Sequence, residues 1–152
     1  MAYRVEWIVQ DRVLYMREYD AVQLEDIRDI SQRAADLLEA AYRSGARLVI
    51  GIVDLSDARF ETSLPLFRHG LEEIAAAVDP RMWKAKPGFV VLITTTEAAR
   101  DITSFVISTS KQPLTTVETL DEALLVVRYM YPELQAQLDA YRDRHLSLGN
   151  AN

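Results

Sequence analysis

The stretch Leu48-Val49-Ile50-Gly51-Ile52-Val53 is apolar throughout and shows no alternation of polar and apolar residues. A run of this kind is typical of a strand that is buried on both faces of a parallel sheet. Residues 89–93 form a second such run, and residues 114–118 predict a third, shorter strand. The sequence therefore predicts a sheet with parallel central strands, covered by helices.

Helical spacing of apolar residues fills the segments between these strands. The clearest case runs from Asp20 to Gly45, where Asp20 and Gln23 predict a capping box and Gly45 a C-terminal stop. Residues 54–63 are polar and are expected to form a loop. Three further helices are expected at residues 64–78, from the Thr94–Glu97 capping box to Pro113, and from the Thr119–Glu122 capping box to Met130.

The N-terminus predicts a β-hairpin. Residues 3–9 and 13–19 are rich in Val, Ile, Tyr and Trp, and the polar residues 10–12 separate them. The expected fold class is therefore α/β: a mixed, mostly parallel sheet over residues 1–131 with an N-terminal β-hairpin and helices packed on it.

Residues 132–152 predict a charged C-terminal helical extension. Its apolar stripe, which includes Leu134, Leu138 and Tyr141, is narrow and looks too sparse for a buried helix. The stripe would lie either on its own domain or on a second copy of the chain. Because an apolar stripe must be covered somewhere, we favour a homodimer.

Composition narrows the function classes. A chain of 152 residues with 49% hydrophobic and 26% charged residues is typical of one globular domain. The absence of cysteine excludes disulfide and thiolate chemistry, and it favours a cytoplasmic location, as does an N-terminus without the apolar core of a signal peptide. The net charge of −6 disfavours nucleic acid as a partner. No apolar run approaches the ~20 residues of a membrane span.

Three acids, Asp54, Asp57 and Glu61, follow the central strand, at the sheet edge where open α/β sheets tend to bind ligands. They could bind a divalent cation or act as an acid/base pair. However, aspartates at strand ends commonly cap turns, and no Ser-His pair or glycine-rich phosphate loop accompanies them. His69 and His145 are too few for a histidine metal site. We therefore expect no catalytic residue, no metal and no cofactor.

The segment Val53-Asp54-Leu55-Ser56-Asp57-Ala58-Arg59-Phe60-Glu61-Thr62-Ser63 resembles the STAS domain, the fold of bacterial anti-sigma-factor antagonists. That family places an apolar strand before Asp-Leu-Ser, then a Phe, then an Asp-Ser-Ser-type segment that opens a helix. Residues 114–124 (LTTVETLDEAL) are similar to the closing strand and helix of the broader SpoIIAA-like group, which shares this fold with SEC14-type lipid-binding domains. The resemblance covers about residues 3–131.

The resemblance implies a bacterial, non-catalytic regulatory module that presents residues 54–67 to a protein partner, such as a kinase-like or signalling regulator. The alternative that it implies is a domain that binds a small molecule or a lipid-like ligand, as SEC14-type domains do. The partner or ligand surface would comprise Asp54, Ser56, Asp57, Glu61, Thr62, Ser63 and Phe67.

The phosphorylated serine of the family falls at Ser63 or at Leu64, depending on the alignment. Leu64 cannot accept a phosphate, which leaves Ser63 and Thr62 as the possible phospho-acceptors. A phosphate at Ser63 would meet the positive end of the following helix. The competing interpretation is that Ser63 is simply the N-cap of that helix.

A basic cluster occupies the loop before the strand at 89–93. It could dock an acidic partner or an anionic head group, with Trp83 as an anchor, or Trp83 could instead fold back onto the core. The basic docking loop consists of Arg81, Trp83, Lys84 and Lys86, with Met82 between them.

Overall fold

The computed structural model describes residues 3–59, 68–97, 101 and 111–149. Within this part of the chain, one five-stranded sheet has the order β1-β2-β3-β4-β5. β1 and β2 form an antiparallel hairpin, whereas β2, β3, β4 and β5 run parallel to one another. The expected α/β architecture is thus confirmed. The strands are β1 (Tyr3–Val9), β2 (Val13–Ala21), β3 (Ile50–Arg59), β4 (Phe89–Ile93) and β5 (Leu114–Val117).

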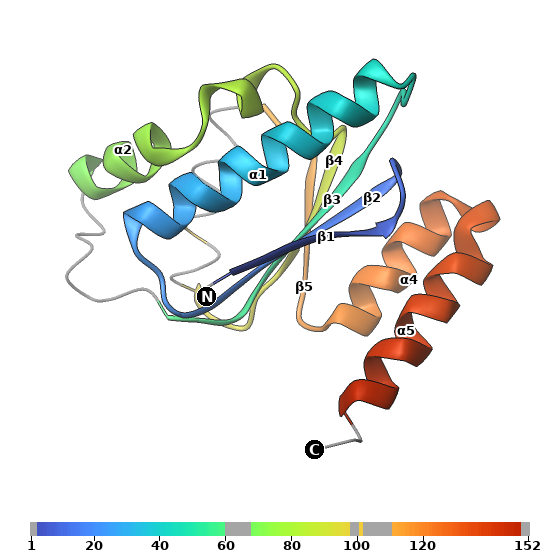
Figure 1. Cartoon of the computed structure of the whole chain (residues 1–152). Helices are drawn as coiled ribbons and strands as arrows, with labels where there is room; N and C mark the ends of the chain where they lie inside the picture. The colour runs from blue at the N-terminus through green and yellow to red at the C-terminus, as the bar shows by residue number, and fades with distance from the viewer. Residues whose placement is uncertain (1–2, 60–67, 98–100, 102–110, 150–152) are drawn as a thin grey trace.

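Helices cover both faces of this sheet (Figure 1). One face carries α1 (Leu24–Arg43) and α2 (Arg68–Ala77), and the other carries α4 (Leu120–Met130) and α5 (Gln135–Gly149). Two short 3-10 helices, η1 (Pro80–Trp83) and η2 (Pro132–Leu134), lie in the connections. The two-sided cover explains why the central strand is apolar at consecutive positions.

Each face of the sheet has its own apolar core. Leu14 packs with Leu38 of α1 on the first face. Ile52 packs with Val127 of α4 and Leu138 of α5 on the second. Leu14 and Tyr15 are neighbours on β2, are both fully buried and belong to different cores, so alternation along this strand supplies both faces.

The start of α1 differs from the expectation. Its N-cap is Gln23, whose backbone N–H donates a 3.0 Å hydrogen bond to the carboxylate of Asp26, whereas Asp20 has a positive φ of 57° at the end of β2. Asp20 cannot cap the helix because β2 continues past it and pairs with β3. The stop at Gly45 is confirmed: this residue has a φ of 102°, in the left-handed region that glycine tolerates.

β3 is longer than the sequence predicts, which corrects the expected loop from Asp54 onward. The strand continues to Arg59, because residues 57–59 pair with residues 19–21 of β2. Between the two paired stretches β3 contains one more residue than β2, which makes a β-bulge. The polar residues 54–59 therefore belong to the sheet rather than to a loop.

The expectations for the remaining helices have mixed outcomes. The helix expected over 64–78 is described from Arg68 to Ala77, and the one expected between the Thr94–Glu97 box and Pro113 lies mostly outside the described residues. At α4, the Thr119 hydroxyl accepts the Glu122 N–H at 3.2 Å, as expected. The Glu122 carboxylate, however, accepts the N–H of Glu118 at 2.9 Å rather than that of Thr119.

The C-terminal segment is a helix, α5, and its apolar stripe is buried. Leu134, Leu138 and Tyr141 are 4%, 2% and 7% exposed, in the same core as Ile52 and Val127. The expectation that this stripe is too sparse for a buried helix is therefore wrong. Because the chain's own sheet covers the stripe, the reason for favouring a homodimer no longer holds. The boundary at residue 131 stays a prediction.

Candidate functional site

The middle of β2 and β3 carries a buried polar cluster centred on Asp54. The Asp54 carboxylate is 3% exposed and lies beside Arg17, its register partner on β2. Tyr15 donates a 2.6 Å hydrogen bond to Asp54 Oδ2. Ser56 donates two bonds to Asp54 Oδ1, from its backbone N–H at 3.0 Å and from its hydroxyl at 2.6 Å. Both carboxylate oxygens of Asp54 therefore accept hydrogen bonds from the chain itself.

Arg17 supplies the positive charge of this cluster. Its Nη2 donates to the carboxylate of Asp57, and its Nε lies 3.8 Å from Asp54 Oδ2. Its guanidinium also lies over the ring of Tyr19, 4.8 Å from the centroid. Burial acts to lower the pKa of Arg17, but the hydrogen bond to Asp57 and the negative charge of Asp54 outweigh it and raise this pKa above its usual range. Arg17 therefore stays charged.

Tyr15 acts as a fixed hydrogen-bond donor. Burial, together with the adjacent charge of Asp54, raises the pKa of Tyr15 well above its usual range. The phenol therefore keeps its proton at any physiological pH. A neutral Tyr15 and a charged Arg17 together hold the Asp54 side chain in one orientation.

The bulge in β3 decides which side chains of this region reach solvent. Asp54 and Leu55 are buried, whereas the next two residues, Ser56 and Asp57, are exposed. A bulge re-aims the side chains beside it, because two residues then face one on the neighbouring strand. Residues closer to the core hold both exposed side chains: Ser56 donates a hydrogen bond to Asp54, and Asp57 forms an ion pair with Arg17.

The structure brings together three of the residues singled out in the sequence: Asp54, Ser56 and Asp57. The remaining ones, Glu61, Thr62, Ser63 and Phe67, lie outside the described residues, so the two expected phospho-acceptors stay predictions. Sequence reasoning missed Tyr15 and Arg17. Both are polar in alternation with the buried Leu14 and Met16, but only the β2–β3 register shows that they face Asp54.

A second polar contact closes the same face of the sheet under α5. Tyr141 donates a 2.8 Å hydrogen bond to Glu6 on β1, and its ring lies edge-on to that of Tyr15, with centroids 6.4 Å apart. The ring of His145 stacks on Tyr141 at 6.0 Å. The C-terminal helix is thus in direct contact with the residue that holds Asp54.

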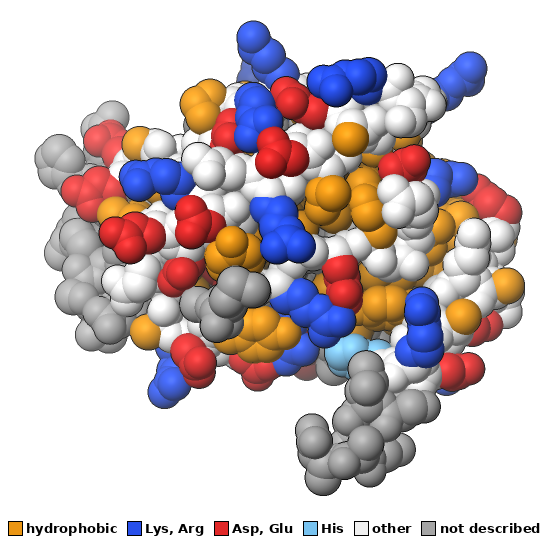
Figure 2. All heavy atoms as spheres, in the orientation of Figure 1, with side chains coloured by type: hydrophobic (Ala, Val, Ile, Leu, Met, Phe, Trp, Pro, Cys, Tyr) orange, Lys and Arg blue, Asp and Glu red, His pale blue; other side chains and the backbone are white. Residues whose placement is uncertain are grey.

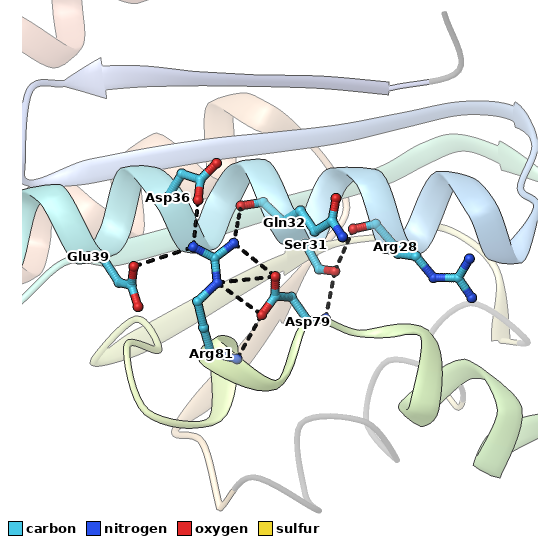
Figure 3. Close-up of polar contacts among 7 residues, drawn as sticks. All are labelled: Arg28, Ser31, Gln32, Asp36, Glu39, Asp79 and Arg81. Atoms are coloured by element: carbon cyan, nitrogen blue, oxygen red, sulfur yellow. Dashed lines mark hydrogen bonds and ion pairs between the residues drawn. The ribbon is translucent and has the colours of Figure 1, made fainter.

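The basic docking loop divides into two parts. Arg81 is directed inward against α1, where its guanidinium binds Asp79 at 2.9 Å, Asp36 at 2.6 Å and Glu39 at 3.3 Å (Figure 3). The backbone N–H of Asp79 in turn donates a 2.8 Å bond to the hydroxyl of Ser31. The ion pairs of Arg81 therefore hold η1 against α1, and its charge is neutralised inside the fold.

The other members of this loop reach the surface. Trp83 is partly exposed, whereas the neighbouring Met82 packs against the core under α1. Lys84 and Lys86 line an open groove of about 550 Å³, together with residues of the end of α1. The groove is lined by charged and polar side chains together with Ala85, Pro87 and Pro113. The alternative expectation of a lipid-like ligand stays a prediction.

Comparisons with known proteins concern the fold. No family model matches the chain, and no curated protein matches it. A search of solved structures finds a crystal structure from Shewanella loihica PV-4, described as an uncharacterized protein from the DUF3478 family with a SpoIIAA-like fold. The two chains share 17% sequence identity over 81% of this chain and 90% of that chain, with a TM-score of 0.48.

The description of that protein names no activity. Within the described residues, no group of three or more His, Asp or Glu side chains has the geometry of a metal site. In the same part of the chain, none of the helices combines the length and the apolar character needed to cross a bilayer.

Proposed function

We propose that this protein is a non-catalytic, regulatory interaction module that presents residues 54–67 to a protein partner. The observation that carries the proposal is the arrangement around Asp54. This carboxylate is buried and accepts three hydrogen bonds from Tyr15 and Ser56, so it acts as a fixed support for the exposed part of β3. A surface that is rigid before binding loses less conformational entropy on binding.

The chemical groups of this cluster support positioning rather than catalysis. A general base must reach a substrate proton, and Asp54 is only 3% exposed, with both of its oxygens already accepting hydrogen bonds inside the fold. A general acid needs a proton that leaves near neutral pH, and the raised pKa of Tyr15 opposes this. Asp57 is held by Arg17, which aims its carboxylate rather than activating it.

The partner would meet an exposed strip of polar and charged groups. The side chain of Asp57 is 54% exposed, and those of Asp20 and Arg59, which form a 3.4 Å ion pair beside it, are 81% and 79% exposed. Ser56 adds a hydroxyl between them. Exposed charges of this kind contribute more to partner choice and association rate than to affinity, so we expect binding that weakens with salt.

The experiment is affinity purification from extracts of the source cells, with purified protein as bait. Asp57→Asn keeps the shape of the side chain and removes its charge, so we expect it to lose the partner that the wild type captures. Asp29→Asn, on the exposed side of α1, removes the same charge elsewhere and should capture the partner normally. Equal capture by both variants would contradict the proposal.

A further inference from the structure

A groove with an unusual concentration of positive charge lies at the opposite edge of the sheet from Asp54. It has a volume of about 550 Å³ and is bounded by the last turn of α1, by the loop before β4 and by the residue before β5. These are the amino ends of β4 and β5, whereas Asp54 pairs with Ile93, the last residue of β4. The groove is therefore separate from the proposed partner surface.

Four cations line this groove: Arg43, Arg47, Lys84 and Lys86. They come from the end of α1 and from the loop after η1, segments about forty residues apart in the sequence. Among the described residues, Arg43, Arg47 and Lys84 take part in no ion pair. The single acid of the groove, Glu39, is bound by Arg81 at 3.3 Å.

The positive charge of this cluster is opposite in sign to the net charge of the chain. The whole protein carries a net charge of −6, so chance alone would place acids among these cations. A basic side chain in the last turn of a helix is common, because it interacts favourably with the helix dipole, and this accounts for Arg43. It does not account for Arg47, Lys84 and Lys86. Figure 2 shows Lys and Arg side chains along the upper edge of the molecule, over the end of α1.

Hydrogen bonds hold the walls of the groove together. The Tyr42 hydroxyl of α1 donates a 2.7 Å bond to the carbonyl of Lys86, and the Gln112 side-chain amide donates to the carbonyl of Pro87. The bonds of Arg81 to Asp36 and Glu39 fix the same loop to α1 from the other side (Figure 3). These hydrogen bonds fix the loop that carries Lys84 and Lys86 relative to the end of α1 that carries Arg43 and Arg47.

We propose that this groove binds a phosphate-bearing small molecule. Its volume lies within the range of about 300–1,000 Å³ that is usual for small-ligand sites. Arg43 and Arg47 suit the planar, bidentate recognition of phosphate oxygens, and Lys84 adds a point charge. The ring of Tyr42, with Pro87 and Pro113, supplies apolar surface for the organic part of the ligand.

Isothermal titration calorimetry with pyrophosphate as the probe tests this proposal. We expect saturable binding to the wild type, weakened about tenfold or more in Arg43→Gln/Arg47→Gln and also in Lys84→Gln. The control Arg128→Gln/Arg142→Gln removes the same charge from α4 and α5 on the other face of the sheet, and it should bind like the wild type. Circular dichroism establishes that each variant is folded, and Lys84→Gln keeps the test valid if the double variant is not.

Three further measurements, with inorganic phosphate, citrate and lipid vesicles, distinguish a phosphate-bearing small molecule from other anions and from a membrane surface. Inorganic phosphate should bind more weakly than pyrophosphate, and citrate should not bind with comparable affinity. Equal weakening in the control pair would overturn the site, because it would show an effect of net charge alone. Citrate binding as tight as that of pyrophosphate would overturn the phosphate assignment. Sedimentation with phosphatidylcholine/phosphatidylserine vesicles, without any binding of pyrophosphate, would replace the small molecule by a membrane surface.

Discussion

The phenol of Tyr15 on β2 donates a 2.6 Å hydrogen bond to the buried carboxylate of Asp54 on the neighbouring parallel strand. This bond joins the two strands at the point where β3 begins its bulge. It lies inside the fold, while the residues that follow Asp54 reach solvent. The pair therefore links the core of the protein to the surface that we propose for a partner.

Replacing Tyr15 by Phe should lower the free energy of unfolding by about 1–3 kcal/mol, because the ring stays packed but the buried Asp54 loses a donor. Urea denaturation measures the change. Tyr129→Phe is a matched control, since Tyr129 is 89% exposed and its hydroxyl should contribute little. Equal stabilities for the two variants would show that the Tyr15–Asp54 bond contributes nothing.

Glu18 should make stability depend on pH. Burial, with a smaller contribution from the charge of Asp26, raises the pKa of Glu18 to about 7 from its ordinary value of 4.5. The folded state therefore holds a proton that the unfolded state has lost between these values. Its contribution to stability is fully present below about pH 4.5 and is lost as the pH rises through about 7.

Glu18→Gln should remove this dependence and stabilise the protein above pH 7 by on the order of 3 kcal/mol relative to the wild type. Urea denaturation across this pH range measures the difference. Glu25→Gln, on the exposed side of α1, should retain the slope of the wild type. A Glu18→Gln profile parallel to that of the wild type would refute the assignment.

Arg81→Gln should loosen the connection between η1 and α1. The variant loses the ion pairs to Asp36, Glu39 and Asp79, so we expect a Tm lower by a few degrees and faster hydrogen exchange in residues 80–88. Exchange in β4, which lies between β3 and β5, should change less. Arg33→Gln, which removes an exposed charge from α1, serves as the control. Unchanged exchange in residues 80–88 would mean that other contacts hold this loop.

Leu138→Ala tests whether α5 is part of the core. Leu138 is 2% exposed and packs in the core of the second sheet face, so the substitution should cost about 2–5 kcal/mol of the free energy of unfolding. Leu125→Ala on α4, where the leucine is 56% exposed, should cost far less. If the Leu138 variant is as stable as the wild type, α5 is an appendage and its stripe needs another cover.

The positions of the strands were the part of the fold that could be predicted best from the sequence. β4 has the expected bounds, because an uninterrupted apolar segment of this length is typical of a buried strand. The hairpin has the expected turn, because the polar residues 10–12 separate two runs rich in strand-forming residues. The end of β3 was missed, since Ser56 and Asp57 are polar and only pairing with β2 reveals them as strand residues.

The candidate site shows the same division. Asp54, Ser56 and Asp57 are close in sequence and were found together, whereas Tyr15 and Arg17 lie about forty residues earlier and meet Asp54 only through the parallel register. The burial of α5 was missed for a related reason. Its narrow stripe is sufficient because α4 already covers the neighbouring part of this sheet face.

Photocrosslinking in the source cells tests the central claim most directly. A photoreactive amino acid is placed at position 56, in the exposed strip after Asp54, or at position 125, on the exposed side of α4. The account predicts a discrete crosslinked partner from position 56 that disappears when Asp57→Asn is added, and no such product from position 125. The same product from both positions, or none from position 56, would contradict an interaction surface at residues 54–67.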